Sequence, residues 1–280
     1  MRQYFMRKSV KLSVVTILYV FGIIFLIVFI QQFSIKDDAL DIISLEGLHV
    51  TSLDSSSKVV PKFSGYNNVE EKKRAFFAYL YPEIQRQNKI VLIERKMVFA
   101  LQDLFLQQQE FNTHQQKVFN KLAKKYQFTG DKVLTVELTL ESLITKVDSI
   151  PMALILVQAA NESVWVASRF AQQGYNFFGL WCFNKGCGFV PKQRNEGAEH
   201  EVAKFRDLSH AVMTYMRNLN RHYAYEDLRK IRQNLRQNDE IVTARALVLG
   251  LSNYSERGQE YIDELLDMLR VNTKHMEKLG

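Results

Sequence analysis

The strongest restriction on the architecture of this chain is an apolar run near its N-terminus, Leu12 to Ile30, which contains no charged residue. A helix of this length is about long enough to cross the hydrocarbon core of a bilayer, which takes ~20 residues. Four cations precede the run, whereas one lysine and three aspartates follow it: Arg2, Arg7, Lys8 and Lys11, then Lys36, Asp37, Asp38 and Asp41. The positive-inside rule therefore predicts one transmembrane helix with its N-terminus in the cytoplasm and the remaining chain outside.

The residues after this run favour an anchor that stays attached. Signal-peptide cleavage needs small residues in an A-x-A-like site, and Gln31 to Ile35 offers no such site. From Ser34 to Asn68 the sequence shows no sustained helical period. We therefore expect a basic flank and signal anchor at residues 1–33, a stalk at 34–68, and a single domain at 69–280.

Composition predicts a mostly helical domain. The chain has only 4 Pro and 12 Gly among 280 residues, and it is rich in helix-forming side chains. The net charge is +7, but four of the cations lie in the N-terminal flank. What is left is too little for the basic stripe of a nucleic-acid-binding protein, so we expect no nucleic-acid partner.

Helical periodicity divides the predicted domain into helices, an irregular lobe and further helices. A helical pattern begins at Glu70 and runs up to Pro82, and Ile84 to Phe105 is expected to continue as one or two amphipathic helices. Another helix is expected over Thr135–Val147. A proline break then leads into Met152–Asn161, which is apolar nearly all round and is expected in the core. A loop-rich lobe punctuated by glycines follows. Later helices are predicted at Ser209–Leu219, Glu226–Leu235, Ile241–Leu251 and Gln259–Leu269, with the basic residues between Arg217 and Arg236 on a solvated face.

The only two cysteines, Cys182 and Cys187, lie in this glycine-rich lobe. Two ligands without a second pair or a nearby histidine cluster make a poor zinc site, so no metal is predicted. Outside the membrane, a disulfide across this short loop is favoured over free thiols.

Glu162 is the residue with the clearest catalytic potential. Its carboxyl group lies among Val157, Val164 and Trp165, so it loses hydration of its charged form and its pKa should rise. A protonated carboxyl group near neutral pH can act as a general acid toward the leaving oxygen of a glycosidic bond. A solvated glutamate at a helix end is the alternative, and this residue alone does not exclude it.

The surrounding sequence favours the catalytic alternative. The segment ILVQAANESVWVASRFAQQGYNFFGLW resembles the core motif of the bacterial glucosaminidase family, glycoside hydrolase family 73, whose usual form is AQAALESGWGxSxxAxxxxNxFG. Glu162 matches the catalytic acid, and the other fixed positions are matched by Ser163, Trp165, Ser168, Ala171, Asn176, Phe178 and Gly179. The Bax-type members are most similar, because they share KKRAFFAYLYP, VDSIP, GLWCFNKGCGFVPKQR, NLNRHYAYEDLR and YSERGQEY. The resemblance covers Glu70 to Asn272.

This resemblance implies an α+β, mostly α, lysozyme-like domain with a small irregular or β lobe. It implies cleavage of N-acetylglucosaminyl-β-1,4 bonds in peptidoglycan glycan strands, without a cofactor. Combined with the anchor predicted at residues 12–30, the expected location is the periplasm, with the domain held to the inner membrane. Tyr254 matches the tyrosine of the family's YATDP-like motif and is expected as a second catalytic residue beside Glu162. Its phenol orients the acid, binds the N-acetyl group or stabilises the transition state; a core tyrosine is the alternative. Aromatic rings stack on sugar faces but also fill cores. The expected substrate-binding residues are Trp165, Asn176, Phe177, Phe178, Gly179, Trp181, Tyr225 and Tyr261.

Two departures from the family pattern bear on activity. Val164 and Val166 stand where the family usually has glycine, and β-branched residues predict against a left-handed backbone there. The family's second carboxylate has no clear counterpart, and Glu196, Glu199 and Glu201 all lie near its position. A lytic transglycosylase on the same fold and a non-catalytic wall-binding scaffold are therefore alternative readings of the same sequence.

Overall fold

The computed structural model describes residues 43–45, 47–50, 59–127, 134–191 and 200–279. Residues 42–280 form one compact unit. The predicted anchor at 12–30 lies outside the described residues, as do Glu196 and Glu199. Within the described ranges, no helix combines the length and the apolar character needed to cross a bilayer.

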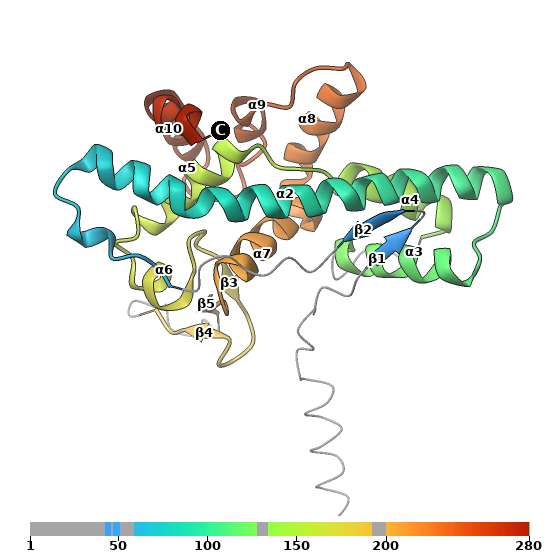
Figure 1. Ribbon diagram of the computed structural model, residues 1–280, viewed down its shortest axis with the longest axis horizontal. Helices are drawn as coiled ribbons and strands as arrows, with labels where there is room; N and C mark the ends of the chain where they lie inside the picture. The colour runs from blue at the N-terminus through green and yellow to red at the C-terminus, as the bar shows by residue number, and fades with distance from the viewer. Residues whose placement is uncertain (1–42, 46, 51–58, 128–133, 192–199, 280) are drawn as a thin grey trace, which may run out of the picture. The chain divides into compact units, whose positions relative to one another are not determined.

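A single helix of 40 residues, α2 (Val69–Gln108), runs through this unit (Figure 1). It begins at Asn68, whose side chain accepts the backbone N–H groups of Glu70 and Glu71. Pro82 lies within the helix and has no N–H to donate to the preceding turn, yet the helix continues across it. Twelve side chains along α2 are buried, and their tertiary packing stabilises the helix. The segment therefore forms a single helix, whereas the sequence left the number of helices undecided.

Most of the other helices pack around α2 or α5, in agreement with the predicted mostly helical class. The helix α5 (Met152–Ser163) lies in the core, and Leu154 to Val157 are fully buried on it, as its all-round apolar sequence predicts. It contacts α2 and α10. The remaining helices are α3 (Thr113–Tyr126), α4 (Val136–Lys146), α6 (Arg169–Gly174), α7 (Leu208–Arg221), α8 (Glu226–Gln237), α9 (Ala244–Val248) and α10 (Gln259–Met276), with 3-10 turns η1 (Phe63–Gly65), η2 (Tyr223–Tyr225) and η3 (Glu277–Leu279).

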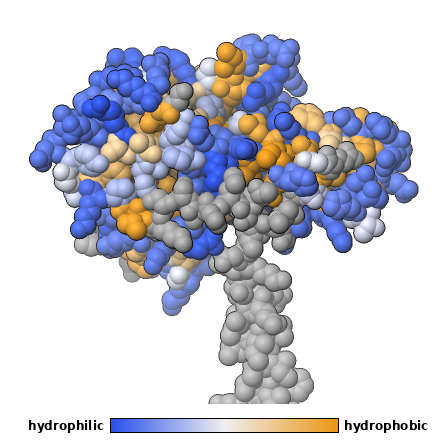
Figure 2. All heavy atoms as spheres, in the orientation of Figure 1, coloured by the Kyte–Doolittle hydropathy of each residue, from blue (hydrophilic) through white to orange (hydrophobic). Residues whose placement is uncertain are grey.

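The described residues also form two small antiparallel sheets. In the lobe between α6 and α7, β5 (Glu201–Ala203) pairs with both β3 (Trp181–Cys182) and β4 (Gly188–Phe189), and Val202 faces Trp181 on one side and Phe189 on the other. Hydrophobic and hydrophilic residues are interspersed on the face in Figure 2, as expected for the surface of a folded domain.

A hairpin of β1 (Ile43–Leu45) and β2 (Leu48–Val50) lies within the segment predicted as a stalk. The strand β2 contacts α2, and β1 contacts α3. Leu45 and Val50 are each 1% exposed, so they belong to the core of the compact unit. The predicted boundary at residue 69 therefore falls inside this unit. Strands of three residues carry too short an alternation for a sequence pattern to reveal them.

A buried charge cluster around Asp148 corrects the prediction that the basic run is solvated. Arg232 is 1% exposed and donates to the carbonyl oxygens of Thr145, Lys146, Asp148 and Ser149. Arg229 is also buried and donates to the carbonyls of Leu219 and His222. Both guanidinium groups thus satisfy carbonyls at the C-terminal ends of α4 and α7, which helices leave without partners.

In the same cluster, several cations face a single carboxylate. Burial alone would raise the pKa of Asp148, but the facing guanidinium groups of Arg232, Arg236 and Arg95 lower it below the usual value. Burial in turn lowers the pKa of Arg232 to about 10 even beside this carboxylate. Three guanidinium groups therefore share one buried carboxylate where α2, the loop after α4, and α8 meet.

Candidate active site

Glu162 lies in the last turn of α5, where the helix carries its side chain to the edge of the core. Its Oε1 accepts a hydrogen bond of 2.8 Å from the hydroxyl of Tyr261. Burial raises the pKa of Glu162, while the Tyr261 hydroxyl and the charge of Arg257 act in the opposite direction without cancelling that rise. The carboxyl group therefore has the raised pKa that the sequence predicts for a general acid.

The hydroxyl of Tyr261 is itself held by a chain of buried polar groups. Gln158 Nε2 donates to it at 2.9 Å, and the Tyr215 hydroxyl donates to Gln158 Oε1. Since Gln158 and Tyr215 are both fully buried, these bonds have no competing water. The hydroxyl of Tyr261 accepts from the amide and donates to the carboxylate, so its proton is directed at Glu162.

Gln158 and Tyr215 were not predicted as site residues. A signal for Gln158 was present, because it is a polar residue on an otherwise apolar helix and lies four residues before Glu162, on the same face. Tyr215 comes from α7 and reaches Gln158 only through the tertiary fold, so no local pattern marks it.

The aromatic loop after α6 closes against the carboxylate at Gly179. A Cβ placed on this residue would lie 2.8 Å from Glu162 Oε2, and the φ of Gly179 is +64°. Any side chain here would clash with the carboxyl group. It would also force the residue into a backbone conformation that is unfavourable for residues other than glycine. The loop is fixed by the Tyr254 hydroxyl, which donates to the carbonyl of Phe178 at 2.7 Å.

Tyr254 therefore holds the loop that touches Glu162, while Tyr261 contacts the acid directly. The two rings are stacked, with centroids 5.6 Å apart and planes within 3°. Tyr225 adds a third ring, 5.7 Å from that of Tyr254, and burial raises its pKa to about 12. The predicted neighbourhood of Tyr254 and Glu162 is thus present, but the phenol that bonds to the acid is Tyr261, which was predicted to bind substrate.

Most of the other predicted substrate contacts are buried within the fold. Phe177 and Phe178 are fully buried, and Phe178 stacks on Tyr215 with a centroid distance of 4.0 Å. Both are core residues in this structure, which corrects their prediction as sugar-binding platforms. Among the predicted aromatics, Trp181 keeps the largest exposed fraction, 50%.

Asn176 and Trp165 also have structural partners. The Asn176 amide donates to the carbonyls of Leu180 and Ala203 and accepts from the Leu180 N–H, which ties the loop to β5. Asn176 is 2% exposed, so the prediction that it binds substrate is corrected as well. Trp165 packs against Phe76 and Phe77 on α2.

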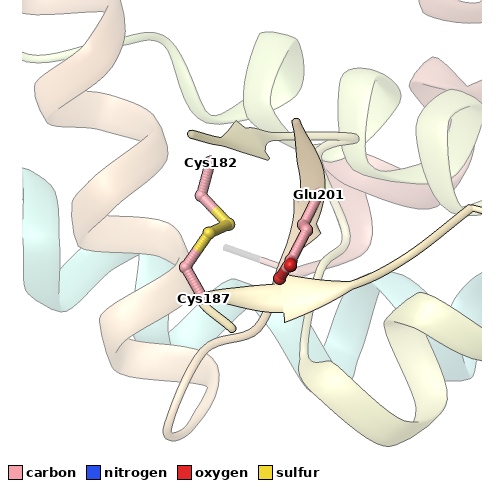
Figure 3. A group of neighbouring side chains, drawn as sticks. All are labelled: Cys182, Cys187 and Glu201. Atoms are coloured by element: carbon pink, nitrogen blue, oxygen red, sulfur yellow. A yellow bond between two sulfur atoms is a disulfide. The ribbon is translucent and has the colours of Figure 1, made fainter. Parts of the chain in front are cut away.

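Backbone hydrogen bonds hold the carboxylate of Glu201 within the β lobe. Its carboxylate accepts the N–H groups of Gly186 at 2.9 Å and Gly188 at 2.8 Å, and it is buried beside the disulfide of Cys182 and Cys187 (Figure 3). The two cysteines are bonded to each other, with Cα atoms 6.2 Å apart, and do not offer thiolate ligands to a metal. Glu201 thus shapes the lobe. The prediction of Glu201 as a second carboxylate stays a prediction.

The backbone after Glu162 contradicts the expectation drawn from the two valines. Val164, Trp165 and Val166 have φ values of 50°, 54° and 65°, so all three are left-handed. The turn is stabilised by hydrogen bonds from the Trp165 N–H to the carbonyl of Ala160 and from the Val166 N–H to the hydroxyl of Ser163. These positions suit glycine, and each non-glycine residue costs about 1–2 kcal/mol there.

Val164→Gly should therefore stabilise the protein. Val164 is 62% exposed, so little packing is lost, and relief of the left-handed strain outweighs the roughly 0.5–1 kcal/mol of extra chain entropy of glycine. We expect a gain of about 0.5–1 kcal/mol and a rise in Tm of about 2 °C, measured by thermal denaturation. Val166→Gly is the matched control, because Val166 is 3% exposed. Its replacement removes about 1.5–3 kcal/mol of hydrophobic stabilisation, so this variant should be less stable than wild type. A less stable Val164→Gly protein would show that this turn stores no strain.

Known proteins match the part of the chain that builds this site. The family model described as glucosaminidase, mannosyl-glycoprotein endo-beta-N-acetylglucosaminidase, matches residues 138–273. Protein bax of Escherichia coli strain K12 is 29% identical over 222 residues, which cover 79% of this chain and 77% of that protein. No solved structure matches. The matched residues run from α4 into α10 and include Glu162, the aromatic loop, and Tyr261.

Proposed function

We propose that the chain hydrolyses N-acetylglucosaminyl-β-1,4 bonds of peptidoglycan glycan strands with Glu162 as general acid, because the glucosaminidase family model matches residues 138–273 and protein bax is 29% identical over 79% of the chain. The observation that carries this proposal is the buried carboxyl group of Glu162, with its raised pKa, facing the hydroxyl of Tyr261. We also propose that the domain is lysozyme-like, with the catalytic acid between a helical body and the small β lobe.

In the proposed reaction, protonated Glu162 gives its proton to the glycosidic oxygen as the bond from that oxygen to C1 breaks. Water then supplies a hydroxyl group to C1 and releases a proton. The positive charge that develops at the sugar in the transition state must be stabilised by a nearby group. Among the described residues, Glu264 acts electrostatically on Glu162, but it is engaged by Arg257 at 2.5 Å. The N-acetyl group of the substrate or a phenol oxygen near Glu162 would fill this role.

Lytic transglycosylation is the alternative reaction, because it also uses a single catalytic glutamate. It closes an anhydro ring instead of adding water. Digestion of purified glycan strands with the full chain, followed by mass analysis, distinguishes the two reactions. Hydrolysis gives products heavier by one water than the anhydro products. Glycan lengths that do not change would instead support a scaffold that binds the cell wall without cutting it.

Removal of one phenol hydroxyl tests the assignment of Tyr261. In Tyr261→Phe, Glu162 loses a hydrogen bond that favours its ionised form, so its pKa rises further. A general acid must be protonated, and activity falls as pH rises through its pKa. We therefore expect the alkaline limb of the pH–activity profile to move to higher pH.

Tyr254→Phe is the matched control, because it removes a neighbouring hydroxyl that bonds to the Phe178 carbonyl. Its alkaline limb should stay in place. If Tyr254→Phe moves the limb and Tyr261→Phe does not, the roles of the two tyrosines are reversed.

We also propose that residues 12–30 anchor the chain in the inner membrane and that the domain acts in the periplasm. The charge-free run and the cations before it support this topology. Alkaline phosphatase fused after Gly280 should be active, whereas a reporter that works only in the cytoplasm should be inactive at the same position. The opposite pair of results would reject the topology without affecting the assignment of Glu162.

A further inference from the structure

A groove of about 1000 Å³ lies along the outer face of α2, away from the candidate active site. The α2 residues that line it run from Pro82 to Phe99, and Met152 and Arg236 contribute from other elements. Met152 is the first residue of α5, whereas Glu162 lies in its last turn. Ten residues of helix separate these positions by about 15 Å along the axis. A ligand in this groove would therefore leave the carboxyl group of Glu162 free.

The groove lining is rich in cations, one of which, Arg86, is paired at 2.6 Å with the buried Glu83. Its lining contains five cations and no carboxylate: Arg86, Lys89, Arg95, Lys96 and Arg236. Lys89 and Lys96 are exposed, and neither forms an ion pair with any residue that the structure describes. They lie seven residues apart, and so about 10 Å apart along the helix axis.

The buried carboxylates behind the groove, Glu83 and Asp148, neutralise only part of its charge. Asp148 faces Arg95 at 3.7 Å and Arg236 at 3.1 Å, and it also faces the buried Arg232. One carboxylate among three guanidinium groups leaves positive charge at the wall of the groove. In a partly desolvated groove this charge attracts anions more strongly than the same charge on a flat surface.

Apolar side chains alternate with these cations. Leu92 and Phe99 are each 40% exposed, and with Lys89 and Lys96 they follow the 3–4 spacing of one helix face. The Arg95 guanidinium lies over one face of the Phe99 ring at 5.0 Å, and a polyphosphate or a plain anionic sugar would leave Leu92 and the exposed part of Phe99 uncovered. A peptide with both carboxylate and apolar side chains would satisfy the whole lining, because aspartate or glutamate meets the cations and a leucine-like residue covers Leu92 or Phe99.

We propose that this groove binds an acidic, partly apolar segment of a partner protein. The proposal is independent of the chemistry at Glu162 and assigns the chain a docking surface in addition to its candidate active site. A segment bound along α2 would lie over the start of α5, so it would join a protein partner to the helix that carries the catalytic acid.

Fluorescence anisotropy of a labelled peptide built from glutamate, leucine and serine tests the proposal with the full chain in a neutral detergent. The peptide should bind, and binding should weaken with added salt, since the screening length falls from about 10 Å at 0.1 M to about 3 Å at 1 M. The same peptide with glutamine at every glutamate should bind at least about tenfold more weakly.

Charge reversal at Lys89→Glu/Lys96→Glu should lower the affinity for the acidic peptide by about tenfold or more. The matched control is Lys117→Glu/Lys124→Glu, because these two lysines are also exposed and also seven residues apart, on α3. This control should bind within about twofold of wild type. Thermal melts establish that both double variants are folded, and Lys89→Gln/Lys96→Gln should show an intermediate loss.

Three results would overturn the proposal. The control pair could weaken binding as much as the groove pair, or the glutamine peptide could bind as well as the acidic one. The third is binding to vesicles of anionic phospholipid that depends on Lys89 and Lys96, without binding to the peptide, which would make the groove a membrane contact.

Discussion

Glu162→Gln is expected to lower the rate of glycan cleavage by about 10²–10⁴-fold, the usual contribution of general acid catalysis. The amide keeps the volume of the side chain and can still accept the hydrogen bond from Tyr261, but it has no acidic proton for the leaving oxygen. The loss should appear mainly in the turnover rate, because the proton is transferred in the transition state. Release of soluble glycan fragments from purified peptidoglycan measures it.

Glu264→Gln is the matched control for this experiment. Glu264 lies near enough to affect Glu162 electrostatically, but its carboxylate is paired with Arg257. Its replacement should leave cleavage close to the wild-type rate. Digestion at the wild-type rate by Glu162→Gln would contradict the catalytic assignment and favour the scaffold alternative.

The Glu162→Gln variant should also be more stable than wild type at neutral and alkaline pH. Burial raises the folded-state pKa of Glu162 above its ordinary value of 4.5, so the ionised carboxylate destabilises the folded protein at pH values above the raised pKa. This destabilisation fades as pH falls through the raised pKa toward 4.5. The difference in Tm between the two proteins should therefore shrink on acidification, and a difference that grows would contradict the pKa assignment.

Arg232→Met should destabilise the protein by about 3–5 kcal/mol, as expected when one partner of a buried charge cluster is removed. Methionine fills much of the volume but leaves four backbone carbonyls without the donors that Arg232 provides. It also removes one of the cations that keep Asp148 ionised in the interior. Equilibrium denaturation gives the change in the free energy of unfolding.

Lys230→Met on the same helix is the control for this effect. Lys230 pairs with Glu226 at 2.9 Å, but both side chains are more than half exposed. An exposed pair at this spacing contributes only about 0.3–0.5 kcal/mol. If Arg232→Met costs no more than Lys230→Met, the Asp148 cluster does not hold the helices together.

The sequence by itself determined the helical body and the place of the acid within it. The apolar period of Met152–Asn161 predicted a buried helix, and the structure confirms it because burial on all sides needs no knowledge of the neighbours. The break before Pro151 and the helix ending in Lys146 follow from local chemistry in the same way. The apolar neighbours of Glu162 in the sequence, Val157, Val164 and Trp165, predicted a desolvated carboxyl group.

Only the tertiary structure decided which side chains surround that carboxyl group. Gln158 and Tyr261 are 103 residues apart in the chain, and the hydroxyl between the amide and the acid exists only where α5 and α10 pack together. The burial of Phe178 and Arg232 could not be predicted from the local sequence either. An aromatic ring suits either a core or a sugar, and a helical arginine is solvated unless another element presents unpaired carbonyls to it.

The left-handed backbone from Val164 to Val166 could not be predicted from the local sequence. Residue type argued against this backbone, and the packing of α5, the loop and the lobe imposed it nonetheless. At about 1–2 kcal/mol for each of its three residues the turn costs about 3–6 kcal/mol, whereas the core that it connects buries many large side chains, so the free energy of tertiary packing outweighs the local preference.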